Sequence, residues 1–567
     1  MKKLFKGITS LILSFILITP VNVSAYNVPD TVRIGLEYKY KNVSTVPISE
    51  TSISVGLNNN MEADFSSSNG GFSVSVSSDY FVNVDESFKY YEDALDEASE
   101  YIRKGYTAFP TYKGEKQWEI YIGGFSQYDT ANTIAEKVGG TVSSPDSDKM
   151  VLKDGSATVL VFDDIKPQIK SKTRDFTLLS DRSYRGVIEL GRYLGGNITA
   201  VNVVPLEEYL YSVVASEMPS SYNEEALKAQ AVAARSYTMT RMTAHSSTGY
   251  ELCDSTHCQV YKGYGGESAR TNKAVDDTKG IMAYYGGSPI NAVFHASSGG
   301  HTDNSENVWV NYVPYLRGVP ELNEIDMNTW KRTYTTSEIQ SIVSANGDYV
   351  GEVTDIVISN ISDTGHILEI QIVGTAGVKT ISKEAIRSYF SSNGGSLESR
   401  VFTINGKGSH PSGENGSYVP PTDVNPPVTE TSVDKFAVLG RDNKSSITYI
   451  EDVYISAASG NTDKEKNMII VQGEGGNSKM YYTKDSGYTG AENSTYTASS
   501  PSGVGSTMVI TNSTPISTAD GSGKFVFEGW GWGHGAGMSQ KGANGMGQMG
   551  YTYDQILKYY YTGIKVK

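Results

Sequence analysis

The chain has few cysteines, fewer basic than acidic residues and no long apolar run. These three shortages argue against a disulfide-rich protein, a nucleic-acid-binding protein and a membrane-spanning protein. Two cysteines among 567 residues leave room for one intrachain disulfide at most. A net charge of −15 argues against the basic surface that a nucleic-acid partner requires. The N-terminal apolar run, residues 8–18, has about eleven residues, whereas a helix that spans a bilayer needs about twenty. Since no later stretch is long enough either, we expect no membrane-spanning helix.

Residues 1–25 have the pattern of a secretory signal peptide. Lysines precede the short apolar run, and Val23, Ser24 and Ala25 form a small-residue cleavage site. We therefore expect an exported, soluble protein, which would stay at the membrane only if this segment is not cleaved.

Residues 205–237 predict two helices separated by a break. Pro205 suits an N-terminal helical position, and apolar residues then recur every three to four positions as far as Val214. Pro219 ends this helix. The second helix is predicted to begin at Ser221, with Glu224 completing a capping box, and its alanines permit close packing.

Glu217 lies in the last turn of the first predicted helix. The negative end of the helix macrodipole disfavours the ionised carboxylate, so partial burial would raise the pKa of Glu217 and suit it to act as a general acid. A glutamate is otherwise more often a solvated surface charge, and the surrounding sequence has to decide between these two interpretations.

That sequence, residues 201–239, reads VNVVPLEEYLYSVVASEMPSSYNEEALKAQAVAARSYTM, and residues 529–543 near the C-terminus read GWGWGHGAGMSQKGA. Both stretches resemble the catalytic domain of the stage II sporulation protein D (SpoIID/LytB) family. Members of this family are lytic transglycosylases of bacterial cell walls, or related amidase enhancers. The resemblance implies an α+β fold, in which a mixed, β-rich catalytic domain carries the two motif helices, and it implies a catalytic role for Glu217.

The resemblance and the composition together divide the chain into seven parts. A stretch rich in Gly, Pro and Ser interrupts the catalytic domain, and the strand at residues 401–405 would otherwise continue almost directly into KFVFEG, so the ends of the insertion should lie close together. The predicted parts are a signal peptide (1–25), an N-terminal strand segment (26–75), a small α+β module (76–165), the first part of the catalytic domain (170–405), a linker (406–434), an inserted β module (435–522) and the final catalytic segment (523–567).

The small α+β module has two interpretations. WEIYIGGFSQYDTANTIAEKV, residues 118–138, resembles the second half of a SPOR domain, a module that binds glycan strands lacking stem peptides. The alternative is an unrelated ferredoxin-like insertion that only spaces or packs against the catalytic part.

The two cysteines, Cys253 and Cys258, also have two interpretations. In an exported protein they can form a disulfide that closes a small loop. Together with His245 and His257, however, they supply the ligands of a closed structural zinc site, and members of the resembled family that bind zinc do so in this loop. Such a zinc would stabilise the loop and would not activate water, because four protein ligands leave no open position. Adjacent His257 and Cys258 could face one metal only if the backbone turns sharply between them.

The resemblance also implies a set of substrate-binding residues. They lie on the second helix, in a loop rich in serine and glycine and in the final glycine-rich segment: Gln230, Arg235, Ser297, Ser298, Gly299, His534 and Gln540.

No second acid stands out beside Glu217, which distinguishes the chain from glycosidases with paired carboxylates. The resemblance implies a lytic transglycosylase that acts on peptidoglycan glycan strands, with or without stem peptides, and leaves 1,6-anhydro-muramic acid ends. The expected location is then extracellular or cell-wall associated, in sporulation or wall remodelling. The competing hypothesis is a non-catalytic amidase enhancer or glycan-binding wall protein, with a cell-wall amidase as its partner.

Overall fold

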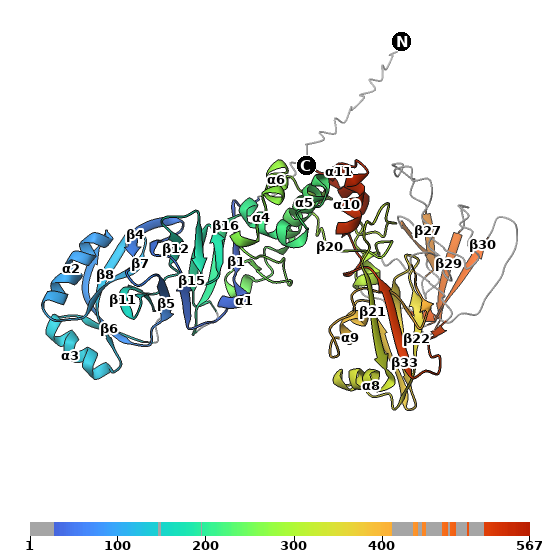
Figure 1. Cartoon of the computed structure of the whole chain (residues 1–567), viewed down its shortest axis with the longest axis horizontal. Coiled ribbons are helices and arrows are strands. Elements are labelled where there is room, and N and C mark those ends of the chain that lie inside the picture. The colour runs from blue at the N-terminus through green and yellow to red at the C-terminus, as the bar shows by residue number, and fades with distance from the viewer. Residues whose placement is uncertain are drawn as a thin grey trace, which may run out of the picture.

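Helices and strands alternate irregularly along the chain, which is the α+β fold that the sequence predicts (Figure 1). The computed structural model describes residues 28–145, 149–193, 196–410 and 515–567, and the backbone of five strands in the predicted inserted module. These strands are β27 (Lys435–Leu439), β28 (Ser445–Tyr449), β29 (Met468–Glu474), β30 (Asn477–Thr483) and β31 (Tyr496–Thr497). The predicted signal peptide and most of the predicted linker lie outside the described residues. No helix of the described part is long and apolar enough to cross a membrane.

A seven-stranded sheet supports the motif helices from one side, in the order β17-β1-β16-β15-β12-β3-β4. Within the predicted N-terminal strand segment, β1 pairs antiparallel with β16, from Thr31 opposite Pro205 to Gly35 opposite Val201. β16 is apolar and buried along nearly its whole length, as expected of a strand covered on both faces. The strands are β1 (Thr31–Gly35), β3 (Ser52–Leu57), β4 (Asn60–Ser66), β12 (Gln168–Ser171), β15 (Val187–Gly191), β16 (Thr199–Pro205) and β17 (Leu252–Cys253).

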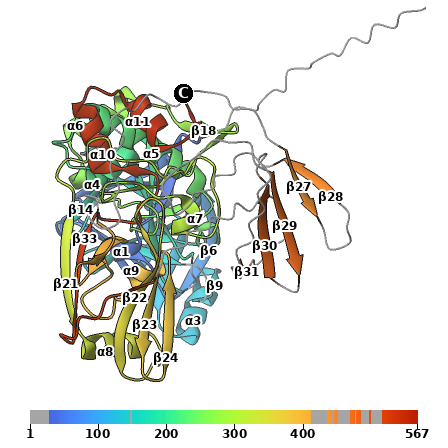
Figure 2. The same ribbon diagram turned by 90° about the vertical axis from the view of Figure 1, so that its right-hand side faces the viewer.

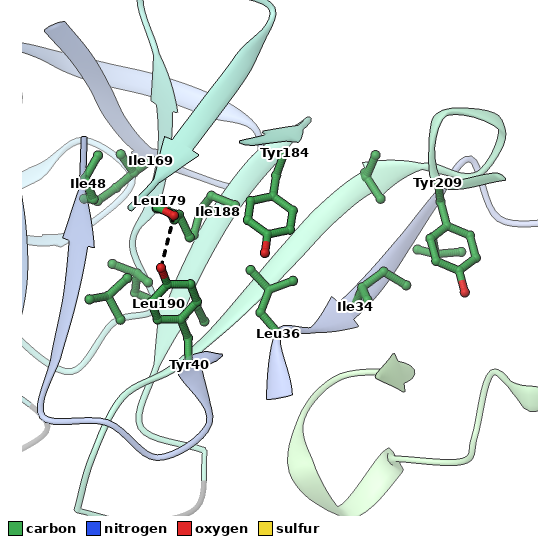
Figure 3. Close-up of a cluster of buried hydrophobic side chains, with 14 of the residues drawn as sticks. Ile34, Leu36, Tyr40, Ile48, Ile169, Leu179, Tyr184, Ile188, Leu190 and Tyr209 are labelled. Atoms are coloured by element: carbon green, nitrogen blue, oxygen red, sulfur yellow. Dashed lines mark hydrogen bonds between the residues drawn. The ribbon is translucent and has the colours of Figure 1, made fainter. Parts of the chain in front are cut away.

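The core of this sheet reaches the first motif helix (Figure 3). Ile34, Leu36 and Ile188 are fully buried in one apolar cluster, and Tyr209 extends the cluster to that helix. Tyr40 crosses the cluster and donates a hydrogen bond of 3.1 Å to the carbonyl oxygen of Leu179. The sheet therefore fixes where the helix begins.

The predicted small module forms a β-α-β-β-α-β unit. Its strands lie in the order β7-β8-β6-β9, which is that of a ferredoxin-like unit and leaves both interpretations of the module open. The same sheet continues through β11, β10, β5 and β2, so the predicted boundary at residue 75 falls within one continuous eight-stranded sheet. The elements are β2 (Thr45–Ile48), β5 (Phe72–Val76), β6 (Tyr80–Phe88), α2 (Tyr91–Arg103), β7 (Ala108–Gly114), β8 (Gln117–Phe125), α3 (Tyr128–Val138), β9 (Thr141–Ser143), β10 (Met150–Asp154) and β11 (Ala157–Phe162).

The two predicted motif helices form as α4 (Leu206–Glu217) and α5 (Glu224–Arg241). The alanine-rich α5 is buried along most of its length, and α4, α6 (Ala269–Asp277), α10 (Gln540–Gln548) and α11 (Tyr553–Tyr560) pack around it (Figure 2). The small side chains allow this close packing, as expected.

The predicted N-terminal cap of α5 is wrong. The helix begins at Glu224, and the cap is Asn223, whose side-chain oxygen accepts a hydrogen bond of 2.9 Å from the N–H of Glu225. Ser221 lies instead in a turn that follows Pro219. Asparagine is as good a cap as serine, and the spacing from Ser221 to Glu224 matched a capping box that does not form.

Residues 329–408 and 516–530 form two four-stranded sheets, in the orders β21-β33-β25-β26 and β24-β23-β22-β32. β22 and β23 are antiparallel neighbours joined by a turn around residues 363–365. The elements are β21 (Thr329–Thr335), α8 (Thr336–Ala345), β22 (Val353–Ile361), β23 (Ile367–Gly374), β24 (Gly377–Ser382), α9 (Ala385–Tyr389), β25 (Val401–Ile404), β26 (Lys407–Gly408), β32 (Ile516–Ser517) and β33 (Lys524–Trp530).

The two ends of the interrupting segment meet in these sheets. β25 and β33 are antiparallel neighbours, with Phe402 opposite Gly529. Just beyond β25, the N–H of Asn405 donates 2.8 Å to the carbonyl oxygen of Val526, and the Lys407 side chain donates 2.8 Å to that of Ser517. The chain thus leaves and re-enters the fold at one place.

Candidate functional site

Glu217 is the last residue of α4, where the sequence predicts a helix end, and its side chain is partly buried. Its C-cap, Met218, is extended and buried, which anchors the break between α4 and α5. The N–H of Val260 approaches the Glu217 carboxylate at 3.4 Å. Burial raises the pKa of Glu217, and three groups that favour the ionised form oppose this rise: the N–H of Val260, the charge of Lys262 and the side chain of Gln540.

Two glutamines connect the carboxylate to two further helices. Gln540 is the first residue of α10, and its amide donates a hydrogen bond of 3.3 Å to the side-chain oxygen of Gln230. Gln230 is fully buried on α5. Four segments therefore set the position of Glu217: α4, α5, α10 and the loop that contains Val260.

In the described residues, no acidic side chain is among the groups that shift the pKa of Glu217. The tyrosines Tyr209 and Tyr237 are near enough for the charge of Glu217 to raise their pKa values, and both pKa values rise mainly through burial. The site thus offers one carboxylate whose pKa lies above its ordinary value, together with one lysine.

Beside this site, the side chains of His245, Cys253, His257 and Cys258 converge, and their donor atoms all lie within 4.8 Å of one another. The two imidazole nitrogens are 3.2 Å apart, and the contacts between sulfur and nitrogen measure 3.4 to 3.7 Å. A tetrahedral zinc with bonds of about 2.0 Å to nitrogen and about 2.3 Å to sulfur would separate its ligand atoms by about 3.3 to 3.8 Å. The four residues therefore fit a zinc ion.

The disulfide interpretation does not match the structure, because both cysteines are free. The sharp turn that a metal site would need is present, since the N–H of Cys258 donates 3.1 Å to the carbonyl oxygen of Ser255 and closes a turn. The pKa of Cys253 is lowered to about 4, first by the hydrogen bond with Cys258, so this thiol readily becomes a thiolate ligand.

Sequence reasoning missed a carboxylate behind this cluster. Glu37, in the short helix α1 (Glu37–Tyr40), lies 3.5 Å from the Nδ1 atom of His245, whose Nε2 atom faces the cysteines. Lys41 and Tyr250 hold Glu37 through hydrogen bonds. A carboxylate in this position orients the ring of a metal-binding histidine. Glu37 could not be linked to the cluster from its position in the sequence, because it is brought beside His245 only when β1 pairs with β17.

Arg235 does not lie where the predicted substrate-binding role would need it. Its guanidinium is fully buried and donates 3.0 Å to Glu207 and 2.9 Å to the carbonyl oxygen of Ile281. These bonds tie α5 to the start of α4, and a fully buried guanidinium is out of reach of a sugar.

The serine- and glycine-rich loop is also buried. Ser297 pairs through its backbone with Trp532, and the hydroxyl of Ser298 donates 3.1 Å to Glu324. Gly299 is buried beside them. The structure therefore does not support the predicted substrate contact of Ser297 and Ser298, because both side chains are buried.

His534 is partly exposed, and its ring lies 5.2 Å from that of Trp309 and 5.4 Å from that of His295. Burial lowers the pKa of His534 to about 3, so the imidazole is neutral at ordinary pH. Trp309, whose ring contacts His534, and Trp532, two residues before it in the chain, are both exposed. Of the predicted substrate-binding residues, His534 is the one that the structure places at the surface.

Parts of the chain are similar to known proteins. Residues 194–285 match the SpoIID family, described as "Stage II sporulation protein", and residues 314–417 match a domain of unknown function, DUF8618. A stage II sporulation protein D from Bacillus amyloliquefaciens is 37% identical over 175 residues, which are 27% of this chain and 51% of that protein. This chain carries a SpoIID domain. The protein of the same name from Bacillus subtilis is 34% identical over 175 residues, with the same coverage of both chains.

An amidase enhancer from Bacillus subtilis is 49% identical over 107 residues, which are 19% of this chain and 14% of the enhancer. The chain thus spans about half the length of the stage II sporulation relatives and a smaller share of the enhancer. The matched SpoIID segment contains α4, α5 and the loop with the cysteines and histidines, and Gln540 reaches the site from beyond it.

Proposed function

We propose that the protein is a peptidoglycan lytic transglycosylase in which Glu217 is the sole acid and base. The observation that carries this proposal is a partly buried carboxylate with a raised pKa at the end of α4, with no second acidic group acting on it in the described residues. A general acid must hold its proton until the reaction, and burial raises the pKa of Glu217 in the direction that this role requires. A hydrolase with two carboxylates would need a partner that these residues lack.

One carboxylate suffices because the substrate supplies the nucleophile. Protonated Glu217 donates its proton to the glycosidic oxygen as the bond from that oxygen to C1 of muramic acid breaks. The 6-hydroxyl of the same sugar then attacks C1 and returns its proton to the Glu217 carboxylate, which gives a 1,6-anhydro end without water. The Val260 N–H, Lys262 and Gln540 stabilise the carboxylate between the two steps.

The residues of the metal cluster have a structural role in this proposal. His245, Cys253, His257 and Cys258 would hold a zinc ion, which supplies four bonds that close the loop. Gln259 follows this cluster and accepts hydrogen bonds from Tyr209 of α4 and Thr238 of α5. The loop thereby presents Val260 to Glu217 from a fixed position.

We further propose that the protein is exported and acts on glycan strands of the cell wall, in sporulation or wall remodelling. The pattern of residues 1–25 and the similarity to stage II sporulation proteins support this. The β-α-β-β-α-β unit is consistent with a SPOR-like glycan-binding module but also with a spacer.

The second candidate function is a non-catalytic amidase enhancer that binds glycan or a cell-wall amidase. Its specific support is the 49% identity to an amidase enhancer over 107 residues. An enhancer would have no effect on glycan until an amidase is added, whereas a transglycosylase acts alone.

Mass spectrometry of purified glycan strands, with and without stem peptides, separates these candidates. Incubation with the mature protein should produce fragments with 1,6-anhydro ends, and incubation with Glu217→Gln should not, because glutamine cannot transfer the proton. Intact strands after incubation with both proteins would contradict the proposed chemistry and favour the enhancer.

A further inference from the structure

The carboxylate of Glu324 gathers an unusual number of hydrogen-bond donors. It accepts from the N–H groups of Ser298 (2.6 Å), Gly299 (3.2 Å) and Gly300 (3.0 Å) and from the hydroxyls of Ser298 (3.1 Å) and Ser539 (3.2 Å). All five groups can donate, which matches an ionised carboxylate, because that group only accepts.

The backbone conformation of the loop at residues 298–300 directs its N–H groups toward Glu324. Gly299 and Gly300 have φ angles of 82° and 105°, which side chains other than hydrogen rarely allow. This backbone turns three consecutive N–H groups toward one point and forms a concave site for an anion. Glu324 occupies that site from within the same chain.

The same carboxylate reaches the helix that contacts Glu217. Ser539 is the N-cap of α10, and its hydroxyl accepts from the N–H of Gly542 at 3.1 Å while donating to Glu324. The next residue is Gln540, whose side chain favours the ionised form of Glu217. The contact between Gln540 and Gln230 then ties this arrangement to α5.

We propose that Glu324 is a positioning residue for Glu217, because its carboxylate fastens the Ser298–Gly300 loop to the first turn of α10 and thereby holds Gln540 against the Glu217 carboxylate. This inference rests on the proposed function for its importance in catalysis. The geometric link from Glu324 through Ser539 and Gln540 to Glu217 can be tested apart from catalysis.

A second glutamate beside Glu324 provides a matched control. Glu321 is buried, and burial, followed by the charge of Glu324, raises its pKa to about 8. Its Oε2 atom accepts a hydrogen bond of 2.7 Å from Tyr560. A neutral carboxyl group resembles the amide of glutamine in shape and charge, so Glu321→Gln should change the local structure little. Glu324→Gln, by contrast, removes a negative charge to which several N–H and O–H groups donate hydrogen bonds.

The experiment measures the protonation of Glu217 by pH-dependent carbodiimide labelling and peptide mass spectrometry. Carbodiimide reacts with the protonated carboxyl group, so labelling falls as the pH rises through the pKa. If Gln540 moves away, the ionised form of Glu217 loses a hydrogen bond and the labelling midpoint moves to higher pH. We expect this shift in Glu324→Gln and in Gln540→Ala, and no shift in Glu321→Gln.

Lys262, Tyr209 and Tyr237, the other charged or titratable groups near Glu217, are the same in all of these variants. Ser539→Ala removes the hydroxyl that links α10 to Glu324 and that also interacts with Glu321, so together with the Glu321→Gln control it tests the same link if Glu324→Gln does not fold. An unshifted midpoint in folded Glu324→Gln, or in Ser539→Ala in its place, would overturn the proposal.

Cleavage of purified glycan by the same variants gives the second measurement. We expect kcat to fall about tenfold in Glu324→Gln with KM little changed, as is typical when a group that orients a catalytic residue is lost. If the wild-type protein cuts no glycan but the labelling midpoint shifts, the positioning role stands and the proposed function fails. If glycan is cut and the midpoint stays in place, the positioning role is wrong.

Discussion

At the scale of the residue, the balance of forces on Glu217 determines what it can do. Burial makes the ionised carboxylate costly, whereas the Val260 N–H, Lys262 and Gln540 make it less so. A group with both a burial penalty and stabilising partners can exchange a proton in either direction, which a transglycosylase requires of its single acid and base.

Lys262 is the one component of this balance that lies at the surface, and it can be changed with little effect on packing. Its backbone N–H, which donates 3.1 Å to Ser212 on α4, is retained in any variant. In Lys262→Gln the positive charge near Glu217 is lost, so the pKa of Glu217 should rise further. Since Glu217 must be protonated in the first step, the pH above which glycan cleavage declines should move upward.

The pH profile of glycan cleavage checks this prediction, with Lys262→Arg as the control that keeps the charge. The difference between Lys262→Gln and wild type should shrink at about 1 M salt, where the screening length is about 3 Å. Identical profiles for wild type and Lys262→Gln at low salt would show that this lysine does not act on Glu217.

At the scale of the element, the loop between α5 and α6 connects the histidine and cysteine cluster to Glu217, the proposed acid and base. Cys258 belongs to the metal cluster, Gln259 is anchored to α4 and α5, and Val260 contacts Glu217. Because Val260 follows Cys258 by only two residues, a change in the position of the cluster should also move Val260 relative to Glu217.

We therefore expect the purified protein to contain about one zinc per chain and to lose thermal stability when the metal is removed, because zinc bonds of a closed site contribute directly to folding. Elemental analysis and thermal unfolding with and without a chelator provide the measurements. Cys253→Ser should bind less zinc and unfold at a lower temperature, without a further decrease on chelation. A protein without zinc, with both thiols titratable and an unchanged unfolding temperature in chelator, would contradict this expectation.

The elements also show how far sequence reasoning reaches. Periodicity and proline placed α4, the break after Glu217 and α5 correctly, because these are local signals. The cap at Asn223 was missed because several polar residues competed within one turn. Arg235 was assigned to substrate because its sequence neighbourhood carries no sign that Glu207, on another helix, neutralises it.

Glu37 and Glu324 were missed for a related reason. Each acts through a partner that is distant in sequence, His245 for Glu37 and Ser539 for Glu324, and only the completed fold brings them together. Local patterns thus predicted that Glu217 lies at the end of a helix, but not which distant groups surround it.

At the scale of the whole molecule, a SpoIID domain is combined with a ferredoxin-like unit on one side and two four-stranded sheets on the other (Figure 1). The surroundings of Glu217 are assembled from segments far apart in the chain, since β1 pairs with the strand before α4 and Gln540 of α10 acts on Glu217. Truncation at either end should therefore disturb the site. Removal of the interior segment after β25 should not.

Replacement of residues 411–514 by a short Gly/Ser linker should leave the fold and the site intact. The ends of this segment are held by contacts that the variant keeps, including the bond from Lys407 to Ser517 and the pairing of β25 with β33. Closing ends that are already close costs little loop entropy, and insertions at such positions are usually tolerated in both directions. We expect an unfolding temperature within a few degrees of wild type and unchanged carbodiimide labelling of Glu217. A lower unfolding temperature together with altered labelling would show instead that the segment contributes to the catalytic part.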